Sequence, residues 1–125
     1  MEESAVRDLL RAERTTTLAR IGAMTTEFEE IVTATAGSNT DDEHDPEGST
    51  IAFERAQVSA LLTEARAYLG ELDRALMRLE AGTYGTCERC GTAITPERLT
   101  ARPATQTCVS CAASAHPKSS DLSGR

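Results

Sequence analysis

The residues of this chain best suited to chemistry are four cysteines arranged in two close pairs. The pairs are Cys87 with Cys90 and Cys108 with Cys111. The 17 residues from 91 to 107 separate them, a spacing typical of a tetracysteine zinc site. Two intervening residues form a tight turn that aims both thiolates of a pair at one ion, and Gly91 allows the positive φ that such a turn needs. The pattern predicts one structural Zn²⁺ per chain, with no coordination position left for a reacting water.

The surroundings of the cysteines also suit a metal. Four thiolates around Zn²⁺ leave a net negative charge, so Arg89, Arg98 and Arg102 are expected to donate to the sulfurs or to neutralise the field. The alternative is free or disulfide-bonded cysteines. The N-terminus lacks the apolar core and cleavage site of a signal peptide. We therefore expect a cytoplasmic protein, in which paired cysteines favour metal over disulfides.

A second group of interest is the acidic stretch "TDDEHDPEGST" at positions 40–50, with five carboxylates between positions 41 and 47. Such residues are also usual in interhelical loops, where Asp45 can cap a helix that has Pro46 at its first position. The two histidines of the chain are His44 in this stretch and His116 near the C-terminus. Neither can complete a nucleophile–histidine–acid arrangement, so the sequence predicts no enzymatic activity.

Helical patterns flank the acidic stretch. Apolar residues recur in steps of three and four from Val6 to Val32, and the pattern fades over 33–40. From Ile51 to Leu79 they follow heptads typical of a coiled-coil seam, and Phe28 and Phe53 are expected in or beside the seam. A short polar connection favours an antiparallel hairpin within one monomeric chain. Seam pairing between two chains is the alternative, because seam length alone does not exclude it.

The sequence therefore predicts an all-α protein. Residues 1–81 are expected to form a long antiparallel coiled-coil helical hairpin with its acidic tip at about 40–50, capped at its end by Gly82. A four-cysteine zinc finger is expected over 82–113, followed by a short C-terminal helix or flexible tail over 114–125. No stretch reaches the ~18 apolar residues of a membrane span, so no membrane association is expected.

The charge of the chain limits its partners. The net charge is −7, and Lys118 is the single lysine. A protein that binds duplex DNA directly needs lysine and arginine to displace counterions, so specific DNA binding is not expected. An acidic protein can still act on nucleic acid indirectly, by docking on a basic protein.

The segment "YGTCERCGTAITPERLTARPATQTCVSC", residues 84–111, resembles the zinc finger of the DksA/TraR family. Besides the cysteines, the shared positions are Tyr84, Gly85, Gly91, Ile94, Arg98, Leu99, Ala101, Arg102 and Pro103. The resemblance extends more loosely back through the second helix to about Asp45. It implies a zinc-finger regulator that binds bacterial RNA polymerase without sequence-specific DNA contacts. In that family a coiled coil enters the secondary channel of the polymerase and brings acidic tip residues near the catalytic magnesium.

The tip motif of the family, Asp-x-x-Asp-x-Ala, fits this chain in two imperfect ways. Anchoring the motif at Asp45 places Gly48 and Thr50 at its second and third positions. Sliding it back by three residues gives Asp42, Asp45 and Glu47, which keeps both aspartates. The resemblance therefore implies Asp42, Asp45 and Glu47 as the residues that act on the polymerase.

Many members of the family cooperate with the alarmone ppGpp through three basic residues. Arg102 matches one of them, whereas Glu71 and Ala112 fall at the other two. A phosphate-rich ligand needs converging positive charge. The sequence therefore predicts weak or absent ppGpp binding, with Arg102 as the contact that remains.

A different class of function is also compatible with the sequence. A zinc-stapled helical hairpin can serve as an adaptor that holds other proteins together without any effect on polymerase. An adaptor predicts a different binding partner and substitutions in the acidic stretch that have no consequence.

Overall fold

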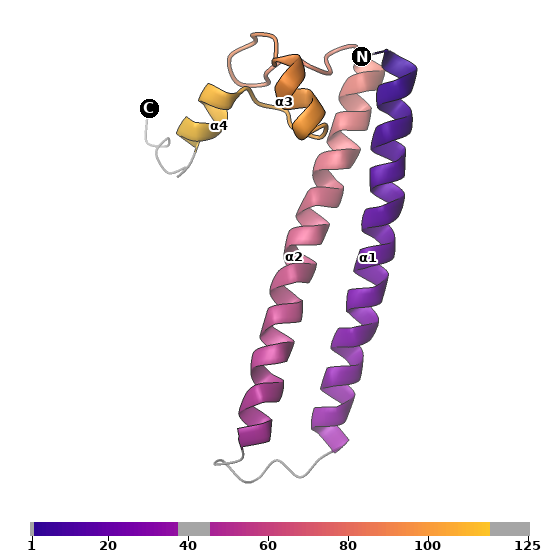
Figure 1. Ribbon diagram of the computed structural model, residues 1–125, viewed down its shortest axis with the longest axis vertical. Helices are drawn as coiled ribbons and strands as arrows, with labels where there is room; N and C mark the ends of the chain where they lie inside the picture. The colour runs from indigo at the N-terminus through magenta and orange to yellow at the C-terminus, as the bar shows by residue number, and fades with distance from the viewer. Residues whose placement is uncertain (1, 38–45, 116–125) are drawn as a thin grey trace. The chain divides into compact units, whose positions relative to one another are not determined.

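The computed structural model describes residues 2–37 and 46–115. Its helices are α1 Glu3–Gly37, α2 Pro46–Ala81, α3 Pro96–Ala101 and α4 Val109–Ala115 (Figure 1). The described residues include no strand, only an isolated antiparallel bridge between Thr86 and Ala93. The all-α prediction of a long helical hairpin with a small finger is confirmed. Among the residues named above, Asp42, His44, Asp45, His116 and Lys118 lie outside the described part.

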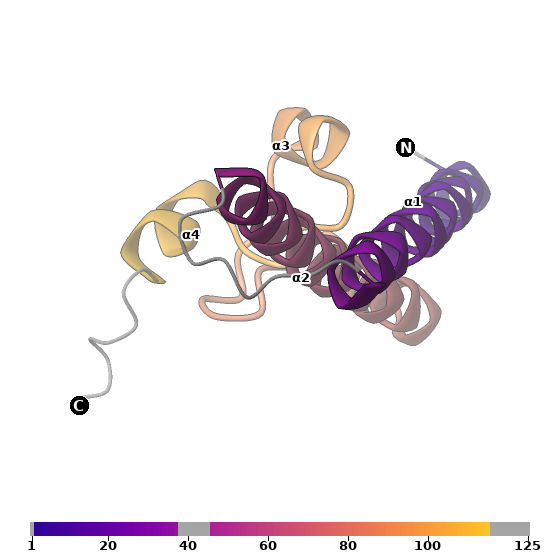
Figure 2. The same cartoon turned by 90° about the horizontal axis from the view of Figure 1, so that it is seen from below.

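The chain divides by its contacts into two units. One comprises Met1–Glu13 with Glu71–Arg125, and the other is Arg14–Gly70. Each unit contains a segment of α1 and a segment of α2, and within each unit these segments run side by side in opposite directions (Figures 1 and 2). The helix pairing is thus made within one chain, as the hairpin prediction requires.

The core of each unit follows the predicted seam of α2. The buried seam residues are Val58, Leu62, Ala65, Leu72 and Leu79. In the first unit α1 adds Val6 and Leu10, whereas in the second unit the only fully buried α1 residue that the structure describes is Thr17. Phe53 departs from the expectation, because its side chain is 68% exposed. Phe53 falls two residues after the seam position Ile51, which places it on the outer face of α2.

The end of α2 sets the path of the chain into the finger. Gly82 has a φ of 83°, and the amides of Gly82 and Thr83 donate to the carbonyls of Leu79 (3.2 Å) and Arg78 (2.8 Å). This is the Schellman pattern, which satisfies carbonyls that the helix end leaves without partners. The Arg78 guanidinium also donates to the carbonyls of Thr83 (2.9 Å) and Thr86. The predicted cap at Gly82 is confirmed, and it fixes the loop just before the first cysteine.

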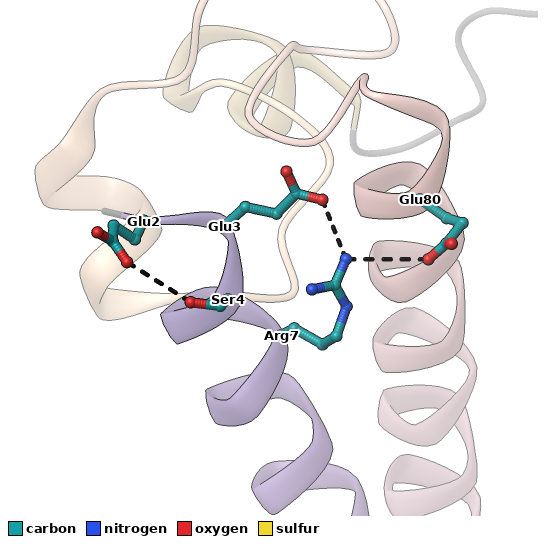
Figure 3. Close-up of polar contacts among 5 residues, drawn as sticks. All are labelled: Glu2, Glu3, Ser4, Arg7 and Glu80. Carbon is teal, nitrogen blue, oxygen red and sulfur yellow. Dashed lines mark hydrogen bonds and ion pairs between the residues drawn. The ribbon is translucent and has the colours of Figure 1, made fainter.

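An ion-pair group joins the two helices within the first unit (Figure 3). The Arg7 guanidinium lies 3.0 Å from a Glu3 carboxylate oxygen on its own helix and 4.0 Å from Glu80 near the end of α2. The carboxylates are largely exposed, so solvent screens both pairs and each contributes only a fraction of a kcal/mol, on the order of 0.5. The pairs therefore orient these helix ends more than they stabilise them.

No helix within the described ranges is both long enough and apolar enough to cross a bilayer.

Candidate functional site

The first cysteine pair sits on a tight turn stabilised by the backbone. The Cys87 amide donates to the Thr92 carbonyl (2.8 Å), and the Gly91 amide donates to the Cys87 carbonyl (2.9 Å). Gly91 has a φ of 79°, a conformation that L side chains rarely adopt. The sequence-based role of Gly91 is therefore confirmed, and the turn carries Cys87 and Cys90 on one side.

The second pair lies at the start of a helix. Cys108 directly precedes α4, and Cys111 lies in its first turn, where the Ala112 amide donates to the Cys108 carbonyl (2.9 Å). The Cys111 amide points at the Cys108 sulfur, with 3.4 Å between the two atoms. One turn of helix thus brings both thiols of this pair to the same side.

The four sulfurs form a compact donor set. All four Sγ atoms lie within 4.8 Å of one another, and the Sγ atoms of Cys90 and Cys108 are 3.8 Å apart. A tetrahedron with Zn–S bonds of about 2.3 Å has edges of about 3.8 Å. The cluster therefore fits one structural Zn²⁺, and with four protein ligands it offers no open position for catalysis.

Burial and hydrogen bonds change the pKa values of three of the four thiols. Burial raises the pKa of the Cys87 thiol, but backbone amides, including that of Cys90, outweigh it and lower the pKa to about 6. A hydrogen bond with Thr92 lowers the pKa of Cys90. A hydrogen bond with the Cys108 sulfur, followed by burial, raises the pKa of Cys111 to about 12, because both favour the protonated thiol. A bound cation favours the thiolate form of its cysteine ligands.

The sequence predicts that Arg98 donates to the sulfurs or neutralises their field, but its guanidinium bonds to oxygen atoms of the finger instead. Its guanidinium donates to the Thr107 carbonyl (2.8 Å) and to the Thr105 hydroxyl (3.1 Å). It thereby ties α3 to the segment that leads into the second cysteine pair. Thr92 supplies the polar side chain at a sulfur instead, with its hydroxyl 3.0 Å from Cys90 Sγ.

The finger is anchored on α2 through Gln106, which the sequence analysis missed. This side chain is 7% exposed, accepts from Arg74 Nε (3.2 Å) and donates to the Glu71 carbonyl (3.3 Å). Its backbone carbonyl accepts from the amide of Glu88, inside the first cysteine pair (2.8 Å). Gln106 therefore connects helix α2 with both halves of the finger.

Replacing Gln106 with leucine is expected to destabilise the protein by about 0.5–1.5 kcal/mol, because Arg74 and the Glu71 carbonyl lose their hydrogen bonds to this side chain. The zinc content should remain at one per chain, since the cysteines are untouched. Chemical denaturation with a parallel zinc assay measures both quantities. The matched control is Gln57→Leu on the exposed surface of α2, and equal stability losses in the two variants would refute the anchoring role.

Tyr84 packs where the finger meets the helix ends of the first unit. Its hydroxyl donates to the Pro103 carbonyl (2.8 Å), and burial raises the pKa of the phenol. With Val6, Leu79 and Leu99 it lines a cavity of about 330 Å³. The tyrosine thus joins the segment before the cysteines to the chain just after α3.

The three positions aligned with the alarmone-binding residues come together in the structure. Glu71, Arg102 and Ala112 line one pocket of about 200 Å³ in the first unit. Arg74, Arg98, Glu88 and Gln106 also line it. Arg74 and Arg98 add positive charge beyond the three aligned positions, but both already bond to protein oxygens. The pocket therefore mixes both signs of charge.

A family model described as the prokaryotic dksA/traR C4-type zinc finger matches residues 82–115. An uncharacterized protein of Aquifex aeolicus (strain VF5) is 54% identical over 46 residues, covering 37% of this chain and 32% of that protein. General stress protein 16O of Bacillus subtilis (strain 168) is 38% identical over 66 residues, covering 53% of this chain and 40% of that protein. The matches thus span less than half the length of these relatives.

The fold has a similar solved structure. It is that of transcription factor DksA2 from Pseudomonas aeruginosa, with a TM-score of 0.73 and 28% sequence identity. The alignment covers 90% of this chain and 81% of that one. The likeness therefore extends well beyond the cysteine segment and includes the long helices.

Proposed function

Because the chain belongs to the DksA/TraR family, we propose that it is a transcription regulator that binds RNA polymerase and has no enzymatic activity. The observation that carries the proposal is the structural match to a transcription factor over 90% of the chain. The match of the zinc finger, residues 82–115, to the dksA/traR model indicates which family of transcription factors is meant. Such a regulator works where the polymerase is, in the cytoplasm.

In the proposed mechanism, the acidic connection between α1 and α2 enters the secondary channel of the polymerase. Asp42, Asp45 and Glu47 then act near the catalytic magnesium and the mobile elements around it. Glu47 belongs to the first turn of α2, which begins at Pro46 as expected. The net charge of −7 favours a channel lined by basic groups over DNA. No sequence-specific DNA contact forms part of the mechanism.

The zinc finger has a supporting role in this mechanism. We assign Cys87, Cys90, Cys108 and Cys111 as the ligands of the structural ion. Zinc then fixes the two cysteine turns, and Gln106 holds them on α2. The metal supplies stability and orientation, and takes no part in chemistry on nucleotides.

Retention of core RNA polymerase on the immobilised chain tests the proposed partner. We expect retention at low salt that weakens as salt rises, because exposed charges are screened. Competing duplex DNA should not release the polymerase. Absence of retention at low salt rejects the proposal, and retention of a different protein in place of the polymerase would favour the adaptor.

The alarmone pocket should bind ppGpp weakly or not at all. Glu71 places a carboxylate in the pocket where a phosphate-rich ligand needs a cation, and Ala112 offers no charge. We expect the double variant Glu71→Lys with Ala112→Lys to bind ppGpp at least about tenfold more tightly than the natural sequence does. Calorimetry measures the dissociation constant for ppGpp of the natural sequence and of the double variant. The control is the double variant with Arg102→Ala added. Low-micromolar binding by the natural sequence that Arg102→Ala abolishes would contradict this prediction.

A further inference from the structure

A groove lies between α1 and α2 within the unit Arg14–Gly70, with a volume of about 320 Å³. The residues that line it, which define the Met24–Leu61 groove, are Met24, Glu27, Ile31, Glu54, Gln57, Val58 and Leu61. They follow one another on each helix at steps of three and four, apart from the adjacent Gln57 and Val58. Each helix therefore turns one continuous face toward the groove.

The apolar part of this groove is incompletely covered. Val58 forms a buried floor, and Met24 and Ile31 are half-buried beside it. Leu61 remains 43% exposed although it lines the groove. Two helices alone leave this surface in water, so a third element that covers it gains hydrophobic contact.

The charged part of the groove has a single sign. Glu27 comes from α1 and Glu54 from α2, and both side chains are exposed. Among the described residues that line the groove, none is basic. Carboxylates on both helices beside an apolar floor suit a ligand that combines an aliphatic stem with a cationic head.

We propose that the Met24–Leu61 groove binds an arginine side chain presented by RNA polymerase. The methylene stem of the arginine lies on Met24 and Leu61, and its guanidinium donates to the carboxylates of Glu27 and Glu54. Arginine fits better than lysine, because its planar fork carries several donors and is more weakly hydrated. The flexible thioether of Met24 adapts to such a stem.

This inference rests on the proposed function for the identity of the partner. It adds a second contact, on the helices themselves, to the one made by the acidic connection. Charge complementarity supports it, since a chain of net charge −7 docks on basic protein surfaces. The groove lies within the helix pair, so its use does not depend on the zinc finger or on the alarmone pocket.

The test compares the affinity of the full chain for core polymerase among matched variants. Glu27→Gln with Glu54→Gln removes both carboxylates and should weaken binding about tenfold, as expected for close charge pairs at an interface. Glu30→Gln with Glu64→Gln makes the same change in net charge on exposed positions outside the groove. This control should bind within about twofold of the natural sequence.

A second variant keeps the test valid if the first one folds poorly. Gln57→Arg fills the groove with a guanidinium from the chain itself, and should also weaken binding about tenfold while circular dichroism stays unchanged. If the groove variants bind as the control does, whether tightly or weakly, the groove proposal is overturned and the proposed function stands. If the natural sequence fails to bind polymerase, both fall together.

Discussion

Replacing Cys87 with serine is expected to remove the bound zinc and unfold the finger. Cys87 is 2% exposed and lies within 4.8 Å of the other three sulfurs, so its loss leaves an incomplete tetrahedron. Structural zinc contributes roughly 10–16 kcal/mol of apparent binding free energy in small zinc domains. A finger with so few other buried residues does not retain its fold without that contribution.

Zinc analysis of the purified variant, together with limited proteolysis, measures this effect. We expect less than about 0.1 zinc per chain and rapid cleavage between residues 82 and 115. Most of the helical circular dichroism should persist, because α1 and α2 hold far more residues than α3 and α4. Ser110→Ala, between the cysteines of the second pair, serves as control and should keep its zinc. Full zinc occupancy in the Cys87 variant would show that the cluster is not the metal site.

Replacing Asp42, Asp45 and Glu47 together with alanine is expected to abolish the effect on transcription initiation while polymerase binding persists. In the proposed mechanism these carboxylates act at the active centre, whereas the helices and finger provide the docking surface. Removing charges that act after docking should change affinity by no more than about threefold, or roughly 0.65 kcal/mol. In vitro transcription and a parallel binding assay separate the two effects.

The matched control changes the remaining carboxylates of the same stretch, Asp41→Ala with Glu43→Ala. Single substitutions then decide between the two alignments of the tip motif. If Asp45→Ala alone reproduces the full loss, the motif begins at Asp45, and if Asp42→Ala and Glu47→Ala each contribute, it begins three residues earlier. Equal losses in the triple variant and in the control would mean that bulk negative charge, and no particular residue, produces the effect.

Local patterns in the sequence predicted the metal cluster and the helices. A few neighbouring residues determine the turns at the two cysteine pairs, at Gly91 and at Gly82. The roles of these residues could therefore be inferred before the fold was known. The heptads of α2 also identified its buried face, because burial recurs with the helix period.

Contacts between distant segments could not be inferred in the same way. Gln106 meets Arg74 across 32 positions and Glu71 across 35, and no local pattern marks a glutamine for burial. The charge of the cysteine cluster predicts that Arg98 donates to the sulfurs or neutralises their field, but its guanidinium donates to the Thr107 carbonyl and the Thr105 hydroxyl. The Met24–Leu61 groove is lined by residues of both α1 and α2. Predicting it requires knowing which residues of the two helices face each other, and the pattern of one helix does not determine that.

The central claim, that the acidic connection reaches the active centre of RNA polymerase, is tested most directly by photocrosslinking. A photoreactive amino acid at position 44 replaces His44 between the proposed acidic residues, and the complex with core polymerase is then irradiated and the crosslinked peptides identified. We predict crosslinks to segments that line the secondary channel beside the catalytic magnesium. Crosslinks confined to the outer surface of the polymerase, or none to polymerase at all, would contradict the account.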